Sequence, residues 1–377
     1  MQLTSGWLIG ALTVLAFSAT GVTVWLLPKV AGRGLRDIAA RTGLLLACQV
    51  AIVVAIAAGM NGYFLFYVSW NDLLGTTGGG NGTVKNGKGG GATGPAATRP
   101  LARTISPLGG AAGLHSVGSD GQLDEVMIHG PRTGLKVKAF VYLPPQYFQP
   151  KFQNTRFPVT LVLAGFPGDP QGMIKRQGLL KDVTVDLKAG RIQPTIYVIT
   201  RSMVAPPRDT ECTDVPAGPQ AESFFSQDVP RAISNTYRVA TGLQGWGVMG
   251  QSTGGYCAAK LAMMHSDRFA AGASLGGYLR SIKDGSTGDL YGGSKQLRDD
   301  NDLIWRLEHR PPPPVSLMLA QTEQGPEFDQ AQRFVALAKP PLRVATLFPP
   351  EGGHNLRTFK RLTPQILRWM SGQLKAE

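Results

Sequence analysis

The chain has few of the residues that commonly bind metal ions. It contains only three cysteines and five histidines among 377 residues, and no set of them has the spacing of metal ligands. The sequence also lacks a glycine-rich phosphate loop and a dinucleotide-binding fingerprint. We therefore expect neither a metal ion nor a nucleotide cofactor.

A concentrated basic block is missing too, although the chain as a whole is strongly basic. Lysine and arginine number 38 against 25 acidic residues, which gives a formal net charge of +13. The basic residues are scattered, and no nucleic-acid-binding module is recognisable. Attraction to an anionic membrane or wall surface explains the charge equally well, so we expect no nucleic-acid partner.

Charge is absent from two stretches near the N-terminus. Residues 7–28 carry no charged side chain, and a helix of that length measures roughly 33 Å, against about 30 Å for a bilayer core. A second uncharged run begins at residue 42, and we assign a span to about 42–68. A cleaved signal peptide is the alternative for the first run, but residues 1–6 contain no basic residue. We expect two retained membrane helices.

The segment between the two runs is basic. Lys29, Arg33, Arg36 and Arg41 stand there against one acid, Asp37. Short basic loops remain on the cytoplasmic side of a membrane. Both ends of the hairpin, and the domain that follows it, are therefore expected outside the cytoplasmic membrane. Five aromatic residues near the end of the second run are typical of an interfacial belt: Tyr63, Phe64, Phe66, Tyr67 and Trp70.

The composition changes abruptly after the second run. Residues 75–110 are rich in glycine and poor in large apolar side chains, so they cannot bury enough apolar surface to fold by themselves. The sequence thus predicts a transmembrane hairpin over 1–74, a flexible linker over 75–110 and one folded domain over 111–377.

Apolar runs alternate with helical patterns from residue 111 onward. This alternation is typical of an α/β fold with a mainly parallel sheet and helices on both faces. The expected strands are 135–144, 158–165, 195–201, 245–250, 270–277, 315–321 and 343–349. The expected helices are 222–238, 253–265, 328–338 and 359–374.

One serine in this domain has small residues on both sides. Ser252 lies in "GVMGQSTGG", after an apolar strand and before a helical stretch. This is the G-x-S-x-G pattern of a nucleophile elbow, in which Gly250 and Gly254 remove collisions around a strained serine. The backbone N–H of Thr253 would point from the helix N-terminus at a developing oxyanion.

An activated serine needs a base and an orienting acid. His354 follows the last expected strand, as the base of an α/β-hydrolase does, whereas His265 ends the helix after the elbow. For the acid, the segment after strand 315–321 offers three carboxylates. We favour Glu323, which comes two residues after the strand, over Asp329, which begins a helix. Glu327 is the third candidate.

A second oxyanion donor is expected from the loop after an earlier strand. The strand over 158–165 is followed by a turn, "GFPG", in which Phe166 has a free N–H and Pro167 has none. A plain surface turn is the alternative for this segment. We predict that the N–H groups of Phe166 and Thr253 form the oxyanion hole.

Two cysteines fall close to the elbow. Cys212 follows a strand, and Cys257 lies five residues after the serine. Because a domain outside the membrane permits disulfides, we predict that Cys212 and Cys257 are bonded; two unrelated buried thiols are the alternative. Around Cys212, we expect Asp209, Glu211 and Asp214 to lie in a solvated loop.

Several of these stretches resemble a known group of enzymes. They are "VYLPPQY" (141–147), "LVLAGFPGD" (161–169), "AESFFSQDVPRAI" (221–233), the elbow and its helix (245–278) and "GGHNLRTF" (352–359). Together they resemble the esterase D and mycolyltransferase branch of the α/β-hydrolases, in particular its membrane-anchored esterases. The resemblance implies Ser252 as nucleophile, His354 as base, and Phe166 and Thr253 as oxyanion donors.

The chain also departs from that branch at two places. The mycolyltransferases carry an Asp-Gly-Leu-Arg type oxyanion loop, where this chain has "AGFPGD", which argues against trehalose mycolyl transfer. Their glutamate lies further into the region after the strand, which retains Glu327 and Asp329 as the acid. The sequence predicts a serine esterase or acyltransferase acting on an ester, such as a lipid or wall acyl ester. The alternative is a non-catalytic module with a hydrolase fold.

Overall fold

The computed structural model describes residues 5–64, 102–106 and 108–377. The chain divides into two compact units, Met1–Thr93 and Gly94–Glu377. Most of the segment predicted as a linker, and the aromatic residues Phe66, Tyr67 and Trp70, lie outside the described residues.

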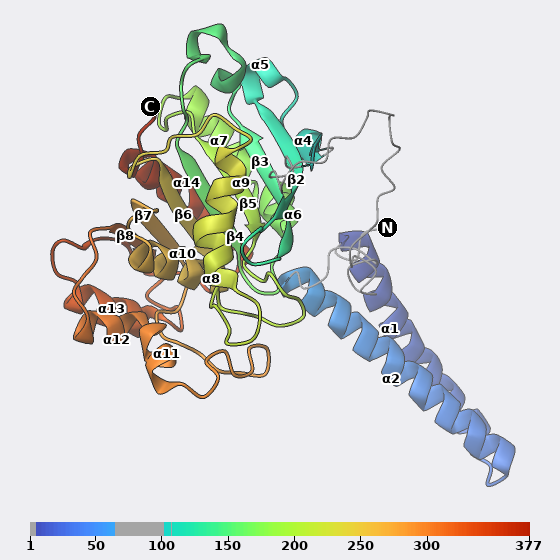
Figure 1. Ribbon diagram of the computed structural model, residues 1–377. Helices are drawn as coiled ribbons and strands as arrows, with labels where there is room; N and C mark the ends of the chain where they lie inside the picture. The colour runs from blue at the N-terminus through green and yellow to red at the C-terminus, as the bar shows by residue number, and fades with distance from the viewer. Residues whose placement is uncertain (1–4, 65–101, 107) are drawn as a thin grey trace, which may run out of the picture. The chain divides into compact units, whose positions relative to one another are not determined.

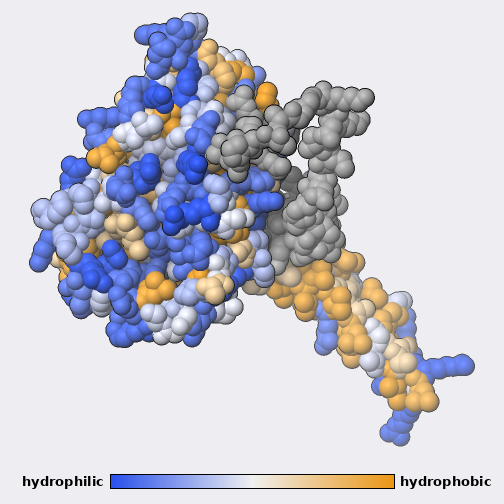
Figure 2. Space-filling view, in the orientation of Figure 1, coloured by the Kyte–Doolittle hydropathy of each residue, from blue (hydrophilic) through white to orange (hydrophobic). Residues whose placement is uncertain are grey.

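The N-terminal unit is a pair of helices. Helix α1 (Gly6–Leu26) leads through the short helix η1 (Leu27–Val30) into α2 (Leu35–Phe64), and the two long helices pack against each other. Two segments, of 25 and 27 residues, are apolar and long enough to cross a membrane. Their exposed side chains are largely hydrophobic (Figure 2). Helix α2 begins before the expected residue 42, so part of the basic segment is helical.

The second unit is built on a nine-stranded sheet with the order β1-β2-β3-β5-β4-β6-β7-β8-β9. Strands β1, β2, β3 and β5 pair antiparallel with their neighbours in this order. Strands β5, β4, β6, β7, β8 and β9 run parallel to one another. The bounds are β1 Ala102–Ile105, β2 Gln122–His129, β3 Lys136–Leu143, β4 Val159–Ala164, β5 Ile196–Arg201, β6 Trp246–Gln251, β7 Ala271–Leu275, β8 Ser316–Ala320 and β9 Arg343–Leu347.

Strands β1 and β2 were not predicted. Strand β1 lies within the range 75–110, so the sheet begins before residue 111, because four residues of β1 pair with β2. Strand β2 contains Asp124, which is 1% exposed and accepts a hydrogen bond from the hydroxyl of Tyr237 (3.0 Å). A buried carboxylate with such a partner interrupts the alternation of apolar and polar residues by which a strand is identified in a sequence.

Helices cover both faces of the sheet (Figure 1). Side chains from α9, α10, α12 and α13 pack on one face, and those from α7 and α14 pack on the other. Helix α7 was not predicted, and the expected helix 222–238 is divided into α8, η5 and α9. The bounds are α7 Leu179–Lys188, α8 Ala221–Ser223, η5 Phe224–Asp228, α9 Val229–Ser234, α10 Thr253–Met264, α12 Leu303–His309, α13 Phe328–Leu337 and α14 Leu356–Gln373.

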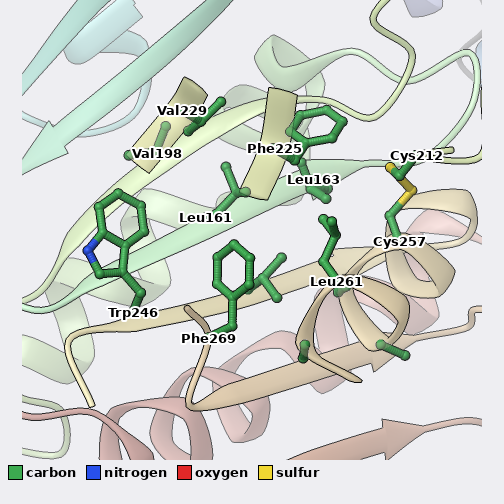
Figure 3. Close-up of a cluster of buried hydrophobic side chains, with 14 of the residues drawn as sticks. Leu161, Leu163, Val198, Cys212, Phe225, Val229, Trp246, Cys257, Leu261 and Phe269 are labelled. Carbon is green, nitrogen blue, oxygen red and sulfur yellow. A yellow bond between two sulfur atoms is a disulfide. The ribbon is translucent and has the colours of Figure 1, made fainter. Parts of the chain in front are cut away.

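The core beneath α10 holds this helix and strand β6 together. Trp246 on β6, Leu161 on β4 and Leu261 on α10 are each no more than 1% exposed, and they meet in one apolar cluster (Figure 3). The disulfide lies at the edge of this cluster. Because the parallel strands all end at the same edge, the loops that follow them are brought together there.

Candidate active site

Ser252 lies at the sharp turn between β6 and α10. Its φ is 56° and its ψ is −127°, a conformation that residues with a side chain rarely adopt. A Cβ on Gly250 would collide with the backbone of Gly254, and a Cβ on Gly254 would collide with the carbonyl oxygen of Leu163. Glycine at both positions therefore lets β4, the serine and α10 approach one another closely.

His354 lies in the loop between β9 and α14. Its Nε2 is 2.9 Å from the Oγ of Ser252, 102 residues earlier in the chain. The imidazole also makes an edge contact with the ring of Phe359, at 5.1 Å between centroids. Burial lowers the pKa of His354 below its usual value, which favours the neutral form that can accept a proton.

The carboxylate nearest to this histidine is that of Glu327, at the start of α13. Its Oε2 is 3.9 Å from His354 Nδ1, and this oxygen is buried without a hydrogen-bond partner in the described chain. Burial raises the pKa of Glu327 above its usual value. The loops after β8 and β9 are tied together where the hydroxyl of Thr322 donates to the carbonyl oxygen of Gly352 (2.9 Å).

The carboxylate favoured from the sequence does not meet the histidine in this way. Glu323 and Asp329 are exposed, and among the described residues neither side chain makes a hydrogen bond or an ion pair. The N–H of Glu323 bonds the carbonyl oxygen of Pro349 (3.1 Å). The chain then turns, and only at residue 327 does a side chain reach back toward His354.

The turn after β4 passes directly against the serine. A Cβ on Gly165 would lie 2.8 Å from the Cβ of Ser252, so a larger residue at 165 would push the turn away from the elbow. In the described part of the chain, the backbone N–H groups of Phe166 and Thr253 donate no hydrogen bond. Unpaired donors beside a nucleophile, one of them at a helix N-terminus, are suited to stabilising an oxyanion.

A serine with a strained backbone, hydrogen-bonded to a histidine at the edge of a mainly parallel sheet, is typical of α/β-hydrolases. The family described as "Putative esterase" matches residues 130–366. This chain belongs to that family. The esterase is a serine hydrolase of the carboxylic ester hydrolase class, with an α/β-hydrolase fold.

Solved structures share the fold of the esterase at low sequence identity. An S-formylglutathione hydrolase from Agrobacterium tumefaciens has a TM-score of 0.58 at 13% identity, covering 74% of this chain and 100% of its own. A ferulic acid esterase has a TM-score of 0.55 at 17% identity, covering 67% and 97%. A fluorophosphonate-binding serine hydrolase from Staphylococcus aureus has a TM-score of 0.53 at 14% identity, covering 72% and 99%. No curated protein matches in sequence.

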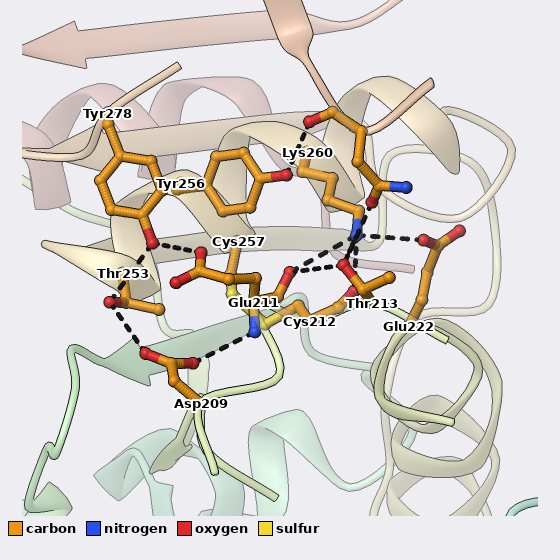
Figure 4. Close-up of a disulfide and its surroundings, with 11 residues drawn as sticks. Asp209, Glu211, Cys212, Thr213, Glu222, Thr253, Tyr256, Cys257, Lys260 and Tyr278 are labelled. Carbon is orange, nitrogen blue, oxygen red and sulfur yellow. Dashed lines mark hydrogen bonds and ion pairs between the residues drawn. A yellow bond between two sulfur atoms is a disulfide. The ribbon is translucent and has the colours of Figure 1, made fainter. Parts of the chain in front are cut away.

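The esterase has a disulfide between Cys212 and Cys257, the pairing expected from the sequence. The expectation of a solvated acidic loop around Cys212 is wrong. Asp209 and Glu211 are 2% and 1% exposed, because the disulfide and the side chains around it cover this loop (Figure 4). Asp214 is partly exposed and accepts hydrogen bonds from Ser223.

Two side chains of this buried region were not singled out from the sequence. Lys260 is fully buried on α10, where it pairs with Glu222 (3.3 Å) and donates to Thr213 Oγ1 (2.9 Å). A lysine in the apolar helical run "CAAKLAMM" was the only available signal, and it is a weak one. Tyr278 follows β7 and donates to Glu211. Across the ranges that the structure covers, no cluster of three or more His, Cys, Asp or Glu side chains could hold a metal ion.

Proposed function

We propose that the chain is a membrane-anchored serine esterase or acyltransferase, with its catalytic domain outside the cytoplasmic membrane. The observation that carries the catalytic part is the 2.9 Å contact between Ser252 Oγ and His354 Nε2 on a strained elbow. A serine hydroxyl is a weak nucleophile unless an adjacent base takes its proton. The contact provides that base.

In the proposed reaction, Ser252 Oγ attacks the carbonyl carbon of an ester while His354 Nε2 accepts the hydroxyl proton. The N–H groups of Phe166 and Thr253 stabilise the negative oxygen of the tetrahedral intermediate. The intermediate collapses to an acyl-enzyme as the imidazolium returns the proton to the departing alcohol. Water or another alcohol then gives its proton to His354 and attacks the acyl carbon. As the bond to the serine breaks, the imidazolium returns that proton to Ser252 Oγ, which restores the free enzyme.

We assign the third catalytic group to Glu327. Its carboxylate faces the Nδ1 of His354, and its Oε2 has no other partner in the described chain. The 3.9 Å separation exceeds a hydrogen bond, and a closer approach of about 1 Å would form one, as catalytic contacts often tighten when substrate binds. A charged Glu327 would then stabilise the imidazolium that forms during attack.

The anchoring part of the proposal depends on the two N-terminal helices. They are long and apolar enough to span a bilayer, and the segment between them carries Lys29, Arg33, Arg36 and Arg41. A basic loop kept in the cytoplasm leaves both termini outside. The substrate would then be an ester at the membrane or wall surface, such as a lipid or wall acyl ester.

A fluorophosphonate probe tests the catalytic proposal, because it bonds only to an activated serine. The full-length protein in detergent should be labelled, and Ser252→Ala should not be. Equal labelling of the two proteins would remove Ser252 from its role, and absence of labelling in both would favour a non-catalytic module.

A series of nitrophenyl esters of increasing chain length, with and without added alcohol acceptors, separates hydrolysis from acyl transfer.

A further inference from the structure

A buried polar network lies beside the elbow, and the proposed reaction does not use it. It involves the loop after β5, which contains Asp209 and Glu211, and the side chains of Thr253 and Tyr278 (Figure 4). Both carboxylates are almost fully buried, although burying a carboxylate is costly unless partners compensate for its lost hydration.

The loop lies along one face of α10. Thr253 and Cys257 are four residues apart on this helix, so their side chains occupy the same face one turn apart. Cys257 is bonded to Cys212 of the loop, and the hydroxyl of Thr253 donates to Oδ2 of Asp209 (3.4 Å). The loop is thus attached to two successive turns of the helix, and the first of these turns begins immediately after Ser252.

Tyr278 contacts Thr253 from a second side. The hydroxyl of Tyr278 donates to Oε2 of Glu211 and lies 3.5 Å from Oγ1 of Thr253. The ring of Tyr278 stacks on that of Tyr256, with centroids 4.9 Å apart. The N–H of Glu211 in turn donates to Oδ1 of Asp209 (3.1 Å), so the contacts form a closed ring.

This arrangement has features that folding alone does not favour. Glu211 and Cys212 have φ values of 49° and 47°, in the left-handed region. Burial raises the pKa of Glu211 to about 8 and that of Asp209 to about 6. Oε1 of Glu211 is buried without a hydrogen-bond partner in the described chain. Strain and buried polar groups gathered at one place often mark a functional constraint.

We propose that Glu211 is a positioning residue, which acts through Tyr278 to hold Thr253 so that its backbone N–H points at the oxyanion. The inference rests on the proposed function, in which that N–H stabilises the tetrahedral intermediate. Donors must already be in place where charge develops, because reorienting them during the reaction raises the barrier. The contacts of Thr253 Oγ1 with Asp209 and Tyr278 confine this side chain, and with it the first turn of α10, to which the N–H belongs.

Substitutions can distinguish the role of the Thr253 side chain from that of its backbone N–H. Thr253→Val retains the N–H but removes both Oγ1 contacts, whereas Thr253→Ser retains them. We expect Thr253→Val and Tyr278→Phe each to lower kcat about 10-fold, less than the 10²–10³ that loss of an oxyanion donor costs. KM should change by less than about 2-fold, since the oxyanion forms during the reaction and is absent from the bound substrate. Thr253→Ser, which keeps the hydroxyl, should recover most of the kcat that Thr253→Val loses.

A double variant and substitutions of Glu211 test whether these residues act through one network. If both residues act through one network, Tyr278→Phe combined with Thr253→Val should lower kcat no further than either single change. Glu211→Gln keeps an oxygen that can accept the hydrogen bond from Tyr278, so it should retain most of the activity that Glu211→Ala loses. Should Glu211→Ala fail to fold, the Tyr278 and Thr253 variants decide the question.

A matched pair elsewhere in the fold provides the control for stability. Asp124 on β2 is also buried and also accepts a hydrogen bond from a tyrosine, Tyr237, and three strands separate β2 from β6 in the sheet. Tyr237→Phe should lower the melting temperature by a similar amount to Tyr278→Phe and leave kcat unchanged.

All kcat values are measured on the full-length protein in detergent, per active site labelled by the fluorophosphonate probe. The inference is overturned if Tyr278→Phe and Thr253→Val keep wild-type kcat, or if Tyr237→Phe lowers kcat as much as they do. In either case, labelling that still depends on Ser252 leaves the proposed function standing. Labelling that does not depend on Ser252 overturns the proposed function itself.

Discussion

Ser252 and His354 contact each other although 102 residues separate them in the chain. The sequence indicated both residues, since the glycines around the serine and the position of the histidine after the last strand are local patterns. The acid is different, because three carboxylates lie within seven residues of one another after β8. Only the path of the turn decides which of them faces the imidazole, and the structure places Glu327 there.

Replacing Glu327 should therefore affect catalysis far more than replacing Glu323. Glu327→Gln removes the charge that would stabilise the imidazolium, and we expect kcat for a nitrophenyl ester to fall by about 10²–10⁴. Glu323→Gln makes the same chemical change on an exposed side chain of the same loop, and kcat should stay within about 2-fold of wild type. A large loss in Glu323→Gln with normal activity in Glu327→Gln would reverse the assignment.

Helix α10 and the loop after β5 depend on each other as elements of the fold. The helix carries Cys257, which is bonded to Cys212 of the loop, and Glu211 and Cys212 both have φ values in the left-handed region. The cysteine pairing could be predicted from the sequence, because both cysteines follow strands that end at the same edge of the sheet. The burial of the acidic residues could not, since it results from packing against Tyr278, 67 residues later than Glu211.

Removing the disulfide should destabilise the domain. The bond joins residues 45 positions apart, and crosslinks of such loops contribute about 2–4 kcal/mol to the free energy of unfolding. We expect the variant with Cys212→Ser and Cys257→Ser to unfold at a clearly lower temperature in scanning fluorimetry of the full-length protein. A reductant should lower the melting temperature of wild type only.

Cys48→Ser is the control for this experiment, because Cys48 is the free cysteine and lies in helix α2. Its melting temperature should match that of wild type with and without reductant. Equal melting temperatures for wild type and the double variant would show that the bond contributes nothing measurable to stability.

The whole molecule combines a pair of apolar helices with a catalytic unit of different surface character. Side chains on the helices are largely apolar and exposed, whereas polar side chains dominate the visible face of the second unit (Figure 2). Large exposed apolar surfaces are unfavourable in water unless a membrane or a partner covers them. The helix pair thus supports the proposed anchoring of the esterase.

The proposed topology predicts where the active serine can be reached. In intact bacterial cells expressing the full-length chain, a fluorophosphonate probe that cannot cross the membrane should label the protein, and Ser252→Ala should remain unlabelled. The protein should also stay with the membrane fraction after alkaline carbonate washing, because two spanning helices bury their apolar surface in the bilayer. Labelling only after permeabilisation, or release by carbonate, would contradict the topology.

The sequence by itself determined the α/β architecture, the elbow serine, the histidine after the last strand and the two apolar helices. Each of these follows from a local pattern of apolar, small or charged residues, and local patterns act within a few turns of chain. The tertiary structure alone decided that Glu327 faces His354 and that Glu211 is buried against Tyr278 beside Thr253. These contacts join separate loops at the carboxyl edge of the sheet, and their geometry depends on how the strands and turns pack together.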